Sequence, residues 1–177
     1  GNSCGGMKEY WDVFENEPMA QGGCIWDWVD QSFREVDQDG NWYWTYGGDY
    51  GPKDVPSFGN FCCNGLVNAV REPHPHLLEV KKIYQNIKST LVDKKNLTIR
   101  VKNWFDFSDL NEYLLHWSVT GDDGTIVAEG SKEVTCAPHA VVDITLGAVK
   151  LPKTLREAYL NLSWTRVKAT PLVTSDW

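Results

Sequence analysis

The sequence predicts an α/β segment followed by an all-β antiparallel sandwich, with the boundary near residues 88–90. Two observations carry this prediction. A helical pattern in the first half is followed by a short, nearly continuous apolar run behind two glycines, which is typical of a buried strand in a parallel sheet. After about residue 89 the spacing of apolar residues changes from 3.6 to 2, which indicates antiparallel strands with one buried face.

The first predicted helix starts near Asn2 or Ser3, either of which can cap it, and ends at Pro18. Its apolar stripe consists of Met7, Tyr10, Trp11 and Phe14. The apolar run at 21–30 then reads as the buried strand.

Residues 31–72 are predicted to be a long irregular stretch with a turn at 37–40 and five aromatics between Trp42 and Tyr50. Long loops in compact domains are usually functional. Pro73 and Pro75 open a second predicted helix. Its buried stripe would be Leu77, Val80, Tyr84 and Ile87.

Alternating apolar residues predict strands across the second half. The segments are 97–101, 113–119, 125–133, 140–146 and 157–166. Asp122-Asp123-Gly124 predicts a hairpin turn between two of them.

Composition excludes several classes of partner. The 177 residues carry a net charge of −7, and residues 1–88 hold 13 acidic against 7 basic residues, which argues against nucleic acid as the ligand. No apolar run reaches the ~20 residues that span a bilayer, so we expect no membrane insertion. The 22 aromatic residues suit either a neutral, hydroxyl-rich ligand or simple core packing. The five cysteines have irregular spacing that does not indicate zinc, and we expect buried thiols.

The candidate site is the carboxyl end of the 21–30 strand and the loop after it, because ligands of parallel sheets bind there. Its polar and aromatic members would be Trp26, Asp27, Trp28, Asp30, Asp49, Phe61 and Asn64. Asp27 and Asp30 form a weak candidate for a carboxylate pair, because residues three apart on a strand point to opposite faces. The alternative is that they cap or orient the loop. His74 and His76 are expected to bond to the backbone at the start of a helix.

Several motifs resemble glycoside hydrolase family 2, and within it the large β-galactosidases. The motifs are QGGCIWDWVDQ at 21–31, YGGDY at 46–50, NFCCNGL at 60–66, REPHPHL at 71–77, EVKKIYQ at 79–85, NWFDFSDL at 103–110 and LHWSV at 115–119. The resemblance covers essentially the whole chain.

The resemblance implies a layout that periodicity alone does not supply. Residues 1–88 would be the last helix-strand-helix of a (β/α)8 barrel (TIM barrel), and 89–177 an immunoglobulin-like sandwich that we expect to lack its final strand. Such a barrel needs about 250 residues, so we expect the chain to be a fragment. The two catalytic glutamates of the retaining mechanism, and the magnesium ligands, would lie upstream of Gly1.

The resemblance also assigns roles to three residues. Trp26 would form an apolar wall for galactose, and Asn64 would also contact the substrate region. Phe61 through its carbonyl and Asn64 through its side chain would bind a sodium ion, with a further ligand from upstream. The alternatives are a barrel-core Trp26, a turn role for Asn64 and plain packing for Phe61. Residues 52–59 and 69–71 depart from the family pattern and leave the preference for a leaving group open.

We therefore expect a fragment of a retaining β-galactosidase that is inactive alone. The alternatives are a non-catalytic carbohydrate-binding or interaction module, with residues 42–50 as its platform, and a family 2 hydrolase for another β-linked sugar. We further expect the parent enzyme to be a homo-oligomer and this chain to self-associate through exposed strand edges.

Overall fold

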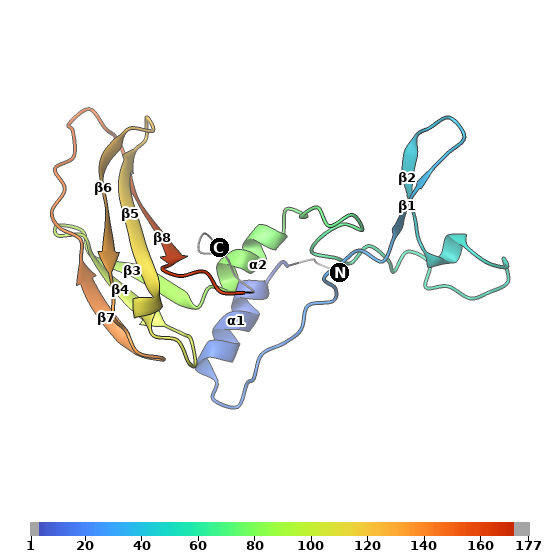
Figure 1. Ribbon diagram of the computed structural model, residues 1–177, viewed down its shortest axis with the longest axis horizontal. Coiled ribbons are helices and arrows are strands. Elements are labelled where there is room, and N and C mark those ends of the chain that lie inside the picture. The colour runs from blue at the N-terminus through green and yellow to red at the C-terminus, as the bar shows by residue number, and fades with distance from the viewer. Residues whose placement is uncertain (1–3, 172–177) are drawn as a thin grey trace. The chain divides into compact units, whose positions relative to one another are not determined.

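A computed structural model describes residues 4–171 (Figure 1). They are mostly β strands arranged in sheets, with few helices. The chain divides into two compact units, one running up to Gln85 and the other from Asn86 on. Each unit has its own hydrophobic core.

Two helices form the core of the first unit. Helix α1 (Met7–Asn16) and helix α2 (Leu77–Ile83) bury Met7, Val80 and Ile83, and Leu66 joins them from the loop between. The rings of Trp11 and Tyr84 lie 4.4 Å apart between their centroids.

Both predicted helices are present, but with different ends. The N-cap of α1 is Gly6, whereas the expected caps Asn2 and Ser3 lie outside the described residues. Tyr10 is exposed rather than part of the buried stripe. Helix α2 ends at Ile83, so Ile87 belongs to the first strand of the second unit.

The predicted buried strand at 21–30 is wrong in this chain. The segment forms no strand, and its ladder pairing is limited to one parallel bridge between Val29 and Val67. A strand of a parallel sheet needs hydrogen-bonded neighbours on its edges, and within the described residues the 64–67 segment is the only other segment that forms backbone hydrogen bonds with it.

A hairpin replaces part of the predicted irregular stretch. Strand β1 (Phe33–Val36) pairs with strand β2 (Trp42–Thr45), and a short 3-10 turn, η1 (Gly47–Asp49), follows. The predicted turn at 37–40 is confirmed: the Asp37 carboxylate accepts hydrogen bonds from the backbone N–H groups of Asp39 and Asn41. The bond from Asn41 is the main cause that lowers the pKa of Asp37.

The second unit contains two three-stranded antiparallel sheets (Figure 1). One sheet has the order β3–β4–β7 and the other β6–β5–β8. The strands are β3 (Ile87–Asp93), β4 (Thr98–Asn103), β5 (Tyr113–Gly121), β6 (Ile126–Glu133), β7 (Val141–Thr145) and β8 (Ala158–Arg166). The five predicted strands and the turn at Asp122–Gly124 are confirmed, while β3 was not predicted.

Apolar side chains from both sheets meet in one core. Strand β4 contributes Ile99 and Val101, β5 contributes Leu115 and β7 contributes Ile144. Asn103 is the buried polar residue beside them. Its side-chain amide donates to the carbonyls of Ser108 and Cys136 and its oxygen accepts from the N–H of Phe105, so burial leaves none of these groups unpaired.

The expectation of buried thiols holds only in part. Cys136 is buried in the sandwich, and burial raises the pKa of its thiol. Cys24 and Cys63 are exposed, because both lie on loops of the first unit. Within residues 4–171, no helix is long and apolar enough to cross a membrane.

We predict that Leu115→Ala destabilises the sandwich by about 2 to 5 kcal/mol, because it leaves a cavity between the two sheets. Leu115 has no exposed surface, whereas Leu151 is 48% exposed in a loop. Leu151→Ala is therefore the matched control and should change the free energy of unfolding by less than about 0.5 kcal/mol. Urea titration followed through the indole resonances of the sandwich measures both, and equal effects would contradict this account of the core.

Candidate functional site

Three loop segments cross in the first unit and form a junction. They are residues 26–31, 64–67 and 73–76. Backbone bonds join the first two: the N–H of Asp27 donates to the carbonyl of Asn64 at 2.8 Å, and the N–H of Asp30 donates to the carbonyl of Val67 at 2.9 Å. The third segment joins through the N–H of His74, which donates to the carbonyl of Leu66 at 3.0 Å.

Asp30 is the central side chain of the junction. It is only 8% exposed. One carboxylate oxygen accepts from the N–H of Gly65 at 2.7 Å, and the other lies 2.8 Å from Nε2 of His74. A buried carboxylate is stable only when it is paired and hydrogen-bonded, and these two contacts meet that requirement.

The two histidines continue this arrangement. The His76 ring nitrogen Nε2 contacts the carbonyl of Gly65 at 3.0 Å, which confirms the backbone role predicted for it. The His74 ring instead contacts Asp30 and stacks on His76, with centroids 5.5 Å apart. Gly65 is thus held on both its N–H and its carbonyl.

The junction leaves no room for a side chain at Gly65. A Cβ atom there would lie 2.2 Å from the backbone nitrogen of Asp30 and 2.4 Å from the carbonyl oxygen of Val67. Only glycine permits so close an approach of two backbones.

A second set of hydrogen bonds positions Asn64. The Asp27 carboxylate accepts from Nε2 of Gln31 at 2.9 Å, and the Gln31 oxygen accepts from the side-chain amide of Asn64 at 3.2 Å. Asp27 and Asp30 therefore each hold loop backbone or side chains, as the alternative to a catalytic pair predicted. Their carboxylates accept hydrogen bonds from different groups, that of Asp27 from Gln31 and that of Asp30 from Gly65.

Trp26 stands at the edge of the junction and is 72% exposed. The peptide bond that joins it to Asp27 is cis. Since the N–H of Asp27 is bound to Asn64, the structure brings Trp26 and Asn64 close to each other. An exposed indole can contact the C–H face of a sugar.

Phe61 lies three residues before Asn64 with an exposed side chain, which disfavours plain packing. Its N–H donates to the carbonyl of Phe58. Across residues 4–171, no donor is recorded on the Phe61 carbonyl or on the side-chain oxygen of Asn64. Neutral oxygens of this kind fit a hard cation. Residues 4–171 contain no group of three or more His, Cys, Asp or Glu side chains that could hold a metal ion.

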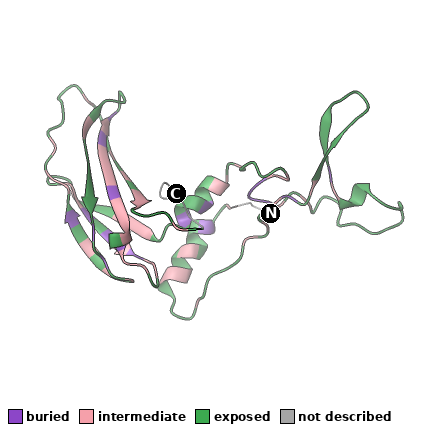
Figure 2. Cartoon of the chain, in the orientation of Figure 1, coloured by how far each residue is buried: buried purple, intermediate pink, exposed green. Residues whose placement is uncertain are grey.

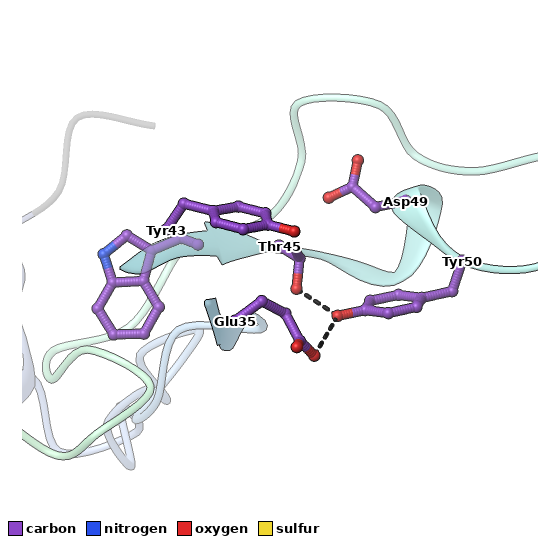
Figure 3. Close-up of a pocket in the computed structure, with 6 residues that line it drawn as sticks. Glu35, Tyr43, Thr45, Asp49 and Tyr50 are labelled. Atoms are coloured by element: carbon purple, nitrogen blue, oxygen red, sulfur yellow. Dashed lines mark hydrogen bonds between the residues drawn. The ribbon is translucent and has the colours of Figure 1, made fainter. Parts of the chain in front are cut away.

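Asp49 is not part of the junction. Its carboxylate accepts from the N–H of Tyr46 in the turn after β2. It lines a cavity of about 460 Å³ against the hairpin, together with Glu35, Tyr43, Trp44, Thr45 and Tyr50 (Figure 3).

Sequence reasoning missed this cavity because it missed the hairpin. The available signal was Asp39-Gly40 between two runs rich in aromatic and β-branched residues, which is typical of a hairpin turn. In Figure 2 the hairpin strands are drawn as almost wholly exposed.

We predict that Gly65→Ala disrupts the junction and lowers the free energy of unfolding of the first unit by about 3 kcal/mol, since backbone atoms must move to admit the methyl group. Gly47 is the matched control because a Cβ there meets no atom within 4 Å. Gly47→Ala should change stability by less than about 1 kcal/mol. Urea titration followed through the amide resonances of Asp30 and Leu66 measures both, and a harmless Gly65→Ala would show that the segments are not packed this closely.

Comparison with known proteins identifies the family. Residues 1–89 match the model described as glycosyl hydrolases family 2, TIM barrel domain, and residues 99–177 match the model described as beta-galactosidase, domain 4. The chain is 38% identical over 173 residues to a beta-galactosidase of Aeromonas hydrophila, with 97% of the chain and 16% of that relative covered.

Two further relatives agree. A beta-galactosidase of Pectobacterium atrosepticum is 40% identical over 96% of the chain and 16% of its own length. One of Priestia megaterium is 42% identical over 82% of the chain and 14% of its own length. The chain thus spans about 16% of the length of the first of these relatives. With half of its residues in the barrel-domain match and nearly all of them in the pairwise matches, the chain belongs to glycosyl hydrolase family 2.

Proposed function

We propose that this chain forms part of a retaining β-galactosidase that hydrolyses terminal β-D-galactosides, and that it supplies one wall of the sugar pocket. The observation that carries the proposal is the exposed Trp26 in a segment whose next residue, Asp27, is hydrogen-bonded through its N–H to the Asn64 carbonyl. The relatives support a galactoside over another β-linked sugar, because those described above are all called beta-galactosidase.

The retaining mechanism decides which roles we assign to this chain and which to the rest of the parent enzyme. One carboxylate attacks the anomeric carbon while a second protonates the leaving oxygen and later activates water. The Asp27 carboxylate is hydrogen-bonded to Gln31, and the Asp30 carboxylate is hydrogen-bonded to Gly65 and His74. We therefore assign neither carboxylate a role as nucleophile or as acid/base. We therefore assign substrate positioning to this chain and both reacting glutamates to other residues of the parent enzyme.

The same proposal covers the finer architecture. Residues 1–88 would be the last helix-strand-helix of a (β/α)8 barrel, and 89–177 an immunoglobulin-like sandwich. The parallel bridge between Val29 and Val67 supports it, because 21–30 would complete its ladder as a strand once neighbouring barrel strands flank it. The barrel-domain match to residues 1–89 supports it as well.

We also propose a sodium ion bound by the Phe61 carbonyl and the Asn64 side-chain oxygen, with a third ligand from elsewhere in the parent. Bound there, the ion would supply positive charge for sugar hydroxyl oxygens. Gln31 would hold the Asn64 amide so that its oxygen stays available. A magnesium ion of the parent would take its ligands from outside this chain.

We predict that Trp26→Ala in the full-length enzyme lowers kcat/KM for nitrophenyl β-D-galactoside by about tenfold to a hundredfold, because an apolar contact worth about 1.4 to 2.7 kcal/mol is lost. Trp42→Ala is the control, since Trp42 is also an exposed indole but lies on the hairpin. It should leave kcat/KM within about twofold.

The purified 177-residue chain completes this experiment. It should release no nitrophenol above its own Trp26→Ala variant, because neither carboxylate of the junction is available for catalysis. Turnover by the chain alone, or equal losses in the two tryptophan variants, would refute the proposal.

We further propose that the parent is a homo-oligomer and that the isolated chain self-associates through unpaired strand edges. The hairpin is a two-stranded sheet, so each of its strands has one free edge, and exposed edges favour pairing between chains. Light scattering should show an apparent mass that rises with concentration. Lys substitution at Val36, an exposed hairpin residue, should reduce this rise, and a constant monomer mass would contradict the prediction.

A further inference from the structure

The β1–β2 hairpin has two different faces. Register pairs Glu35 with Tyr43 and Phe33 with Thr45, so these four side chains share one face. The turn after β2 adds Asp49 and Tyr50 to it (Figure 3). This face borders the cavity of about 460 Å³, which lies within the size range of small-molecule sites.

Hydrogen bonds within this face hold its polar groups in place. The Tyr50 hydroxyl donates to the Glu35 carboxylate at 3.0 Å and lies 2.5 Å from the hydroxyl of Thr45. Figure 3 shows Tyr50 pointing between these two residues. The ring of Phe33 packs edge-on against Tyr50 with centroids 5.8 Å apart, so the phenol is fixed without a ligand.

The phenol of Tyr50 is held as a donor. The Thr45 hydrogen bond lowers the pKa of Tyr50, but burial and the neighbouring Glu35 carboxylate outweigh it and raise that pKa. The group therefore stays protonated at neutral pH.

The two carboxylates on this face have no cationic partner. Over the part of the chain that the structure describes, no ion pair is recorded for Glu35 or Asp49. The nearest basic residue in sequence, Arg34, lies over the ring of Trp42 at 5.1 Å. Each carboxylate retains lone pairs that can accept hydrogen bonds from a ligand.

The partly exposed ring of Tyr43 completes the lining, whereas Trp44 pairs with Arg34 and directs its ring to the opposite face. Aromatic faces pack against the C–H groups of a pyranose ring. The cavity thus combines a hydroxyl donor, carboxylate acceptors and aromatic surface in one place.

We propose that this hairpin face is a binding site for a neutral, polyhydroxylated ligand, that is, for a carbohydrate. A sugar hydroxyl both donates and accepts, so it can pair with Glu35 and Asp49 as donor and with the Tyr43 hydroxyl as acceptor. An organic ammonium ion only donates, and it would leave the Tyr43 hydroxyl without an acceptor. The mixed lining therefore favours the sugar over the cation.

This inference goes beyond the proposed function, because none of its residues is Trp26, Phe61 or Asn64. It also holds whether or not the parent enzyme hydrolyses galactosides.

The test is an amide-resonance titration of the 177-residue chain with lactose, cellobiose and maltose. At least one disaccharide should produce saturable shifts at Glu35, Tyr43 and Tyr50. Glu35→Gln should weaken binding about tenfold, as expected for the loss of one hydrogen bond to a charged group, and Tyr43→Phe should weaken it about fivefold, since it removes the hydroxyl donor to the sugar. Val36→Ala lies on the opposite face and should leave the affinity within about twofold.

Several outcomes would overturn the proposal. These are no saturable shift with any of the three disaccharides, equal affinity in all the variants, and tighter binding of tetramethylammonium than of sugar. Shifts confined to Trp26 and Asn64, abolished by Trp26→Ala, would also overturn it while supporting the proposed function. Unchanged amide resonances of the 37–40 turn in the variants show that the hairpin is folded.

Discussion

The paired carboxylate of Asp30 is the interaction on which the candidate site depends. It ties the N–H of Gly65 to the ring of His74 at a junction of three loop segments. Removing one partner of a buried, hydrogen-bonded charge costs far more than the pair contributes, because the remaining group is left unsatisfied. Neither Trp26 nor Asn64 belongs to a helix or strand, so both keep their positions through this junction and through the backbone bond between Asp27 and Asn64.

The second unit is stabilised in a different way. Its core is apolar and continuous between two sheets, and Asn103 is fully satisfied by three bonds to the backbone. Such a core contributes most of its stability through buried area. The first unit buries a smaller cluster around its two helices and relies on specific polar contacts. The unit that carries the candidate site is therefore the one whose geometry depends on single hydrogen bonds.

Sequence reasoning predicted the sandwich strands well because period-2 alternation is a local signal, visible in segments such as Tyr113–Gly121. It predicted the two helices because the 3.6-residue spacing of apolar side chains is also a local signal. It failed at 21–30, where an apolar composition indicates a strand but the ladder requires neighbours that no local pattern can reveal. It could not predict the contact between Asp30 and His74, which are 44 residues apart. The roles of Trp26, Phe61 and Asn64 remain predictions from resemblance, which the geometry makes physically reasonable.

The bond between Asp30 and Gly65 also closes a loop of chain at its base. The two residues are 35 positions apart, and everything between them, including the hairpin, leaves and returns at one point. Closing a longer loop costs little additional entropy, so insertions or deletions in the hairpin can be accommodated without moving Trp26 or Asn64. Residues 26–31 and 64–67 can therefore keep their geometry when the hairpin changes in length or charge.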